Sequence, residues 1–141
     1  MGNASKGESR LRLSEERGRA LLTILLTNRQ DLVVRDEPLD IGLDYMVAID
    51  DPAKRGVRRF GIGMKATEQP TTKVRVKDWV KEIRRHGPFP FPVILAVVEI
   101  RQADLMYSWV TAPTKRGSGV KLTDAEPELA ALTDATLQVI V

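Results

Sequence analysis

Apolar residues recur along the chain at two spacings, one typical of helices and one typical of strands. Leu21, Ile24 and Leu25 form a stripe at helical spacing, and Ser14 precedes them with two acids directly after it. A serine hydroxyl followed by acids suits the first turn of a helix, because both favour its exposed amide groups. A helix is therefore predicted over residues 14–27.

Two further helices are indicated by spacing and by capping residues. Apolar residues recur at helical spacing over residues 76–85, and Gly87-Pro88 ends this pattern. The pattern Thr123-Asp124-Ala125-Glu126 matches a capping box, in which the first and fourth side chains satisfy each other's amide groups. A short helix is therefore predicted over residues 123–132.

Short apolar segments bounded by turn residues predict strands. The predicted strands are residues 32–34, 41–49, 57–66, 93–100, 105–111 and 136–141. Turn residues at 50–56 predict that the second and third strands form a hairpin, and the uninterrupted apolar run of the fourth predicts a buried central strand. The order α-β-β-β-α-β-β-α-β indicates an α+β fold, with helices around one mixed central sheet.

The chain of 141 residues suits one domain. Residues 1–12 are polar and are predicted to form a flexible tail, so the domain is expected to span 13–141. Its core is placed at 14–111, and a C-terminal helix and strand at 120–141.

Composition excludes several classes of protein. The longest apolar run is too short to span a bilayer, and the N-terminus lacks the apolar segment of a secretion signal, so a cytoplasmic protein that does not contact membranes is expected. With no cysteine and one histidine, thiol chemistry and sites built on sulfur or several imidazoles are excluded. Any metal site must use oxygen ligands, which favours Mg²⁺ or Mn²⁺.

Positive charge is concentrated in the middle third of the chain, although the net charge is only +3. Between Pro52 and His86 there are eleven lysines or arginines against three acids. Such a segment is typical of proteins that bind a phosphate backbone, and DNA is the expected partner. The alternative is a solvated surface that maintains solubility. The candidate nucleic-acid contacts are Arg58, Arg59, Lys73, Arg75, Lys77 and Arg84.

A candidate catalytic site follows from side-chain alternation in the hairpin. Asp44 and Lys65 fall on the same face if the two strands pair, and Glu16, early in the first helix, is able to face them. Two carboxylates there, Asp44 and Glu16, would hold a divalent ion that activates water and polarises a phosphate, while Lys65 would neutralise developing charge. Structural alternatives remain: Asp44 paired with an arginine across the hairpin, Lys65 extended to solvent, and Glu16 as a first-turn acid.

The order of short motifs around these residues resembles the PD-(D/E)XK, or restriction-endonuclease-like, superfamily. It is most similar to an uncharacterised bacterial branch with a Gly-Ile-Asp strand and a Gln-x-Lys strand. Gly42-Leu43-Asp44 stands at the first motif and Met64-Lys65-Ala66 at the end of the second. The Pro-Val strand of that branch corresponds to 92–98, and its aromatic strand to Tyr107-Ser108-Trp109.

This resemblance implies a restriction-endonuclease-like core with a mixed sheet flanked by helices. It also implies magnesium-dependent cleavage or binding of DNA, in bacterial defence or mobile-element biology. The chain departs from the family at Gly63, where an acid or glutamine is usual, because glycine supplies no side-chain ligand. Two functions therefore stay open. One is a nuclease-like, DNA-associated domain with weak or lost activity. The other is a non-catalytic interaction or assembly protein that keeps the scaffold and binds another protein or itself.

Overall fold

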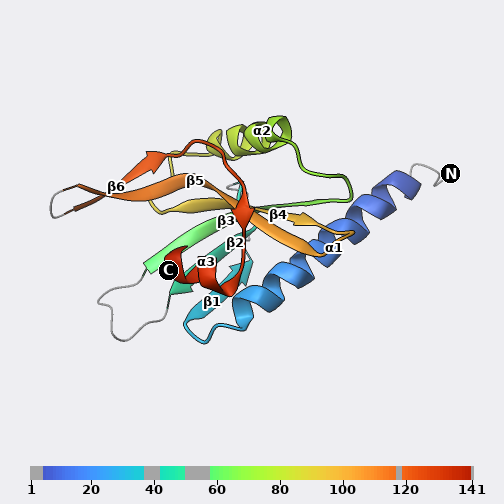
Figure 1. Ribbon diagram of the computed structural model, residues 1–141, viewed down its shortest axis with the longest axis horizontal. Coiled ribbons are helices and arrows are strands. Elements are labelled where there is room, and N and C mark those ends of the chain that lie inside the picture. Colours follow the sequence, from blue (N-terminus) through green and yellow to red (C-terminus); the bar gives the residue numbers. More distant parts are fainter. Residues whose placement is uncertain (1–4, 37–41, 50–57, 117–118, 141) are drawn as a thin grey trace.

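The computed structural model describes residues 5–36, 42–49, 58–116 and 119–140 (Figure 1). Its elements in chain order are α1 (Ser5–Thr27), β1 (Leu32–Asp36), β2 (Tyr45–Ile49), β3 (Arg58–Thr67), α2 (Lys73–Arg84), β4 (Val93–Glu99), β5 (Asp104–Arg116), β6 (Gly119–Asp124), β7 (Ala130–Ala131) and α3 (Asp134–Ile140). Among the described residues, none of these helices is long and apolar enough to cross a bilayer.

The strands form one mixed sheet in the order β1-β2-β3-β4-β5-β6, with the short β7 beside β5. The first three strands are antiparallel, and so are the pairs β4–β5 and β5–β6. Only β3 and β4 run parallel, because α2 carries the chain from the end of one to the start of the other. The predicted hairpin of β2 and β3 is confirmed as an antiparallel pair, although its turn at 50–57 lies outside the described residues.

Helices cover both faces of the sheet, with α1 and α3 on one side and α2 on the other (Figure 1). Leu22 of α1 and Leu137 of α3 pack against one face, while Val80 of α2 packs against the opposite face. The prediction that residues 93–100 form a buried central strand is confirmed, since six of the seven β4 residues are buried. The α+β class with a mixed sheet and flanking helices is therefore correct.

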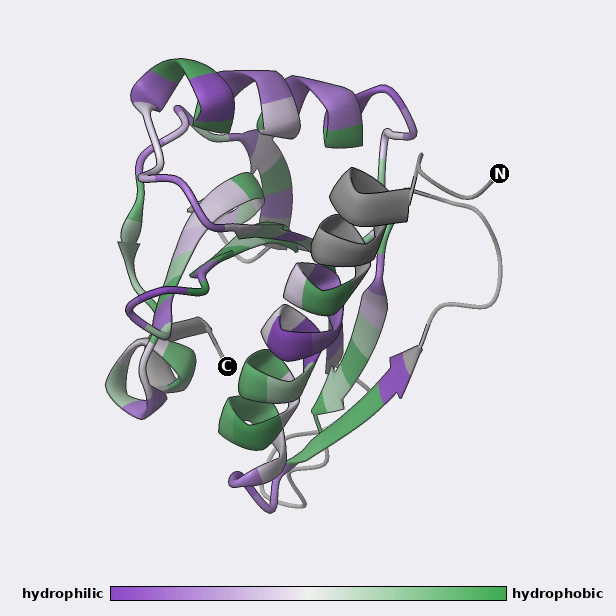
Figure 2. Ribbon diagram, turned by 90° about the vertical axis from the view of Figure 1, so that its right-hand side faces the viewer, coloured by the Kyte–Doolittle hydropathy of each residue, from purple (hydrophilic) through white to green (hydrophobic). Residues whose placement is uncertain are grey.

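The first helix differs from its prediction in two ways. It begins at Ser5, so the predicted tail is helical from that residue and Ser14 lies inside the helix rather than at its cap. Its buried stripe is Ser14, Gly18, Leu22 and Leu26, whereas Ile24 is 59% exposed. The predicted stripe was thus displaced by one to two residues, because five apolar residues at 21–22 and 24–26 leave the inward face undetermined by hydropathy alone. Figure 2 shows how strongly hydrophobic the second half of α1 is.

The C-terminal elements were predicted with the wrong type. Residues 123–132 do not form a helix: Asp124 pairs with Thr111 in the sheet, and an extended segment leads to β7. Pro127 explains the failure of the capping box, because a helix starting at Thr123 needs an amide hydrogen at that position. The predicted strand 136–141 is instead α3, up to residue 140.

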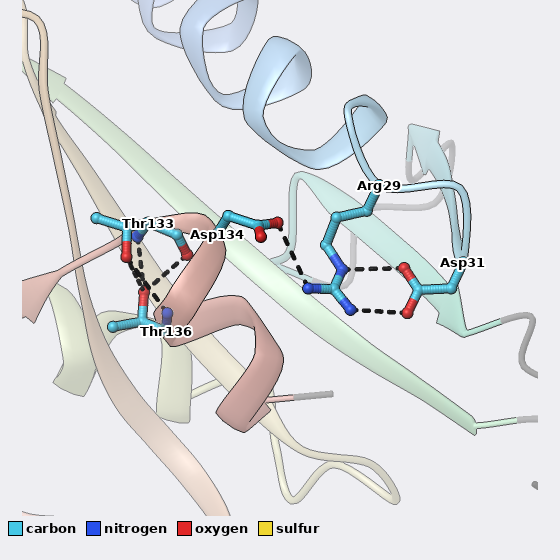
Figure 3. A network of polar contacts seen from close by, with 5 residues as sticks. All are labelled: Arg29, Asp31, Thr133, Asp134 and Thr136. Atoms are coloured by element: carbon cyan, nitrogen blue, oxygen red, sulfur yellow. Dashed lines mark hydrogen bonds and ion pairs between the residues drawn. The ribbon is translucent and has the colours of Figure 1, made fainter.

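A polar network joins the end of α1 to the start of α3 (Figure 3). Arg29 donates two hydrogen bonds to Asp31, at 2.9 and 2.8 Å, and also contacts Asp134 of α3 at 3.5 Å. The hydrogen-bonded carboxylate of Asp31 raises the pKa of Arg29. Thr133 and Thr136 cap each other, since each hydroxyl accepts the other residue's amide hydrogen.

Candidate functional site

The candidate site lies at a notch in the sheet, where β3 continues past the start of β2. The antiparallel pairing of the two strands ends at Tyr45 and Ile62, whereas β3 extends to Thr67. Among the described strands, residues 63–67 of β3 therefore pair with β4 alone. Both α1 and α2 contribute side chains at this notch, although they cover opposite faces of the sheet.

Asp44 closes the inner end of the notch. Its amide donates to the Ile62 carbonyl at 2.8 Å, and its Oδ2 accepts the Met64 amide at 2.7 Å. The carboxylate thus continues the hydrogen bonding of the strand pair before the first residue of β2. Gly42 allows the segment before β2 to pass close to His86. Its φ of 81° is unfavourable for other residues, and a Cβ there would lie 2.3 Å from the His86 ring.

The other oxygen of Asp44 faces a guanidinium group. Nη2 of Arg19 lies 3.6 Å from Oδ1, and the same guanidinium lies 5.8 Å from the ring centre of Tyr45. Gly18 allows α1 to pack closely against β3 beside Arg19, since a Cβ at residue 18 would lie only 2.9 Å from the Cβ of Ala66 on β3. Among the described side chains, the arginine that pairs with Asp44 is therefore Arg19 of α1, whereas the sequence suggested one across the hairpin, Arg58 or Arg59.

Lys65 lines the same cavities as Asp44. It lies on the α2 side of β3, and its Nζ is 3.6 Å from Oε2 of Glu82 on α2. A cavity of about 400 Å³ and a smaller one of about 50 Å³ both include Asp44 and Lys65 in their walls. The larger cavity is lined by Glu15, Arg19, Gly42, Asp44, Met64, Lys65, Ala66, Arg75 and Trp79.

The acid that α1 presents to this cavity is Glu15, not the predicted Glu16. Glu16 is exposed, on the same side of the helix as the 59% exposed Ile24. Glu15 and Arg19 are four residues apart and each follows a residue of the buried stripe, Ser14 and Gly18. The small buried residues Ser14 and Gly18 were the available signal, because small residues often mark close helix packing.

The residues of the notch suit a divalent ion poorly. Gly63 is buried, and a Cβ at that position would lie 2.6 Å from Cδ1 of Ile83, so α2 fills the space of the missing ligand. Oδ2 of Asp44 already accepts an amide hydrogen, and Oδ1 faces Arg19. In the part of the chain that the structure describes, no three acidic or histidine side chains converge to hold a metal. Mg²⁺ needs fixed oxygen ligands in octahedral geometry, which this arrangement does not supply.

The predicted DNA contacts divide into exposed groups and groups held by other contacts. Lys73 and Lys77 are exposed on α2, and Arg59 is exposed with its guanidinium 5.0 Å from the ring centre of Phe91. Arg84 has a structural role, because its Nη2 donates to the carbonyls of Val110 and Ala125 and so joins α2 to β5 and to the segment that follows β6. The side chain of Arg58 lies outside the described residues.

Arg75 is the predicted contact that reaches the candidate site. Its guanidinium stacks on Trp79 with 4.7 Å to the ring centre, and Nη1 lies 3.3 Å from the Thr67 hydroxyl. Within the described residues it makes no ion pair with an acid. The cavity wall therefore carries a fixed cation whose charge is not neutralised by contact.

No protein-family model, curated protein or solved structure matches the chain.

Proposed function

We propose that the protein is a nuclease-like domain that binds DNA and whose hydrolytic site is degenerate. The observation that supports this most strongly is that Asp44, directly before β2, and Lys65 of β3 line one cavity together with Arg75 of the basic helix α2. An acid at the start of one strand and a lysine on the strand paired with it agree with the resemblance to the PD-(D/E)XK superfamily. The bacterial defence context rests on that resemblance alone.

The outer surface of α2 supports a role in binding a phosphate backbone. Lys73, Lys77 and Lys81 are exposed and stand four residues apart, so they form a row along the helix. Like charges at this spacing destabilise an isolated helix, and a polyanion bound along the row would remove that cost. Hydrophilic residues dominate this helix in Figure 2.

A salt titration of DNA binding tests this function. Each phosphate neutralised should contribute about −0.9 to the slope of log affinity against log salt concentration. We expect measurable binding at low salt and a negative slope that becomes shallower when Lys73 and Lys77 are changed to glutamine. A lack of binding at low salt, or binding with no salt dependence, would contradict the proposal.

Loss of hydrolysis is tested by rebuilding the missing ligand. We expect the natural protein to cleave DNA weakly or not at all in Mg²⁺. Gly63→Glu alone would clash with Ile83. The variant in which Mg²⁺-dependent cleavage is measured is therefore Gly63→Glu combined with Ile83→Ala, which makes room for the new side chain. Ile83→Ala alone is the control. Efficient cleavage by the natural protein that survives Asp44→Asn would place any catalytic site elsewhere.

A second candidate function, protein interaction or assembly on the same scaffold, is favoured by exposed apolar side chains on both helices. Leu13 and Ile24 of α1 are each 59% exposed, and Val74 of α2 is 68% exposed. If DNA binding is absent, self-association measured by sedimentation becomes the next test.

A further inference from the structure

The carboxylate of Asp44 is the natural starting point for a metal site, yet both of its oxygens already have partners. The Met64 amide donates to Oδ2 at 2.7 Å, so this oxygen is directed into the edge of β3. Oδ1 faces Nη2 of Arg19 at 3.6 Å. A positive guanidinium therefore stands beside the one carboxylate oxygen that is directed toward the cavity.

Cationic side chains that an anion could contact also line the cavity. Lys65 and Arg75 line the same cavity as Arg19, so three cationic side chains share its wall with the two acids Asp44 and Glu15. Asp44 is neutralised by Arg19, while Glu82, in the wall of the smaller cavity, lies beside Lys65. The position from which a second carboxylate ligand would come is occupied by the side chain of Ile83.

The side chain of Arg75 is preorganised by its contacts with neighbouring residues. Stacking on Trp79 and contact with the Thr67 hydroxyl restrict the guanidinium without neutralising it. A restricted arginine loses little conformational freedom on binding, and its remaining N–H groups match the oxygens of a phosphate.

We propose that the cavity is a metal-independent site for one phosphodiester group, in which the guanidinium of Arg19 takes the place of the divalent ion. Arg75 and Lys65 would donate to the phosphate oxygens, and Asp44 would hold Arg19 in position rather than bind a metal. This deepens the proposed function, since the phosphodiester is assumed to belong to DNA. No bond is made or broken in this role.

Titration with Mn²⁺ in the absence of DNA tests whether Arg19 occupies the position of a divalent ion. Thermal unfolding and calorimetry of the full chain should show no saturable Mn²⁺ binding up to about 1 mM, because a single shared carboxylate is a poor site. Arg19→Gln leaves Asp44 and Glu15 as two carboxylates in one cavity wall, so it should bind Mn²⁺ more tightly than the natural protein and gain more thermal stability from it, and adding Asp44→Asn should abolish this gain. The matched control Arg17→Gln, exposed on the same helix, should behave like the natural protein. Saturable Mn²⁺ binding by the natural protein that is lost in Asp44→Asn would overturn the proposal.

DNA binding measured in the presence of a chelator tests whether the site binds a phosphodiester without a metal ion. Affinity should be the same in EDTA and in Mg²⁺ at matched ionic strength. Arg19→Gln and Arg75→Gln should each make the salt slope shallower by about 0.9, as for loss of one phosphate contact, whereas Arg17→Gln should leave it unchanged. Binding that requires Mg²⁺ would overturn the metal-independent site but leave DNA binding intact. If DNA is not bound at all, the proposed function fails, and this phosphodiester site fails with it.

Discussion

Asp44 combines two roles that separate substitutions can distinguish. Its carboxylate accepts the Met64 amide and so completes the edge of the strand pair, and it also faces Arg19. The first contact is a hydrogen bond to a charged group, whereas the second is an ion pair at 3.6 Å with a 47% exposed arginine. The hydrogen bond is therefore expected to dominate stability, because exposed ion pairs contribute little.

Asp44→Ala should accordingly lower the free energy of unfolding by about 1–3 kcal/mol, because it leaves the Met64 amide without its acceptor. Asp44→Asn keeps an acceptor oxygen and should cost less than about 1 kcal/mol, the upper range of an exposed ion pair. Urea unfolding of both variants measures the difference. Equal losses would show that the amide contact does not stabilise the fold, and Asp44→Asn is the better variant for functional assays.

Individual elements show where sequence patterns sufficed. The hairpin of β2 and β3, the helix α2 and the buried β4 follow from apolar spacing and turn residues, which local chemistry determines. The α1 stripe was displaced because the apolar residues around Ile24 surround the helix, so only packing against Ala66 fixes the inward face at Gly18. That displacement moved the inward acid from the predicted residue to Glu15.

The C-terminal elements failed for reasons that the sequence did contain. Pro127 removes an amide hydrogen that the predicted helix needs, and Thr133 with Thr136 forms the reciprocal cap that starts α3. Apolar composition at 136–141 suggested a strand, but the buried Leu137 packs from a helix. The presence of Asp44 and Lys65 in one cavity was predictable from alternation, whereas Arg19 and Ile83 enter through contacts between distant segments.

The contact between α1 and α3 should depend on Arg29. Its side chain is only 11% exposed and makes a two-bond contact with Asp31, so Arg29→Met should lower the free energy of unfolding by about 1–3 kcal/mol. Asp134, 75% exposed and 3.5 Å away, should contribute less, and Asp134→Asn should cost at most about 1 kcal/mol. Denaturant titrations compare the two. A larger loss for Asp134→Asn would contradict this ranking.

The row of lysines on α2 predicts opposite effects on stability and binding. Lys77→Glu places an acid four residues from both Lys73 and Lys81, so it should stabilise the free protein by about 0.2–0.5 kcal/mol per pair. The same change should weaken DNA binding through charge reversal. Arg101→Glu, exposed after β4, is a control of equal charge. Unchanged DNA affinity in Lys77→Glu would exclude this face of α2 from the interface.

At the scale of the whole molecule, the candidate site depends on both layers of helices. Asp44, directly before β2, and Lys65 of β3 are close in sequence, but Arg19 comes from the helix on one face and Arg75 from the helix on the other. Side chains of both helices line the cavity beside the part of β3 that extends past the start of β2. The same late start of β2 lets Asp44 reach the edge of β3.

The stacking of Arg75 on Trp79 also gives the protein an optical reporter at the cavity. The chain has two tryptophans, and Trp109 lies on β5, where it contacts Tyr107 edge to face at 6.4 Å between ring centres. In a Trp109→Phe variant, emission would come from Trp79 alone. A ligand that draws the guanidinium away from the indole should change the intensity or wavelength of that emission, and Arg75→Gln should remove the response. Occupancy of the cavity can thus be followed without a label, and emission unaffected by saturating DNA would show that the cavity stays empty in the complex.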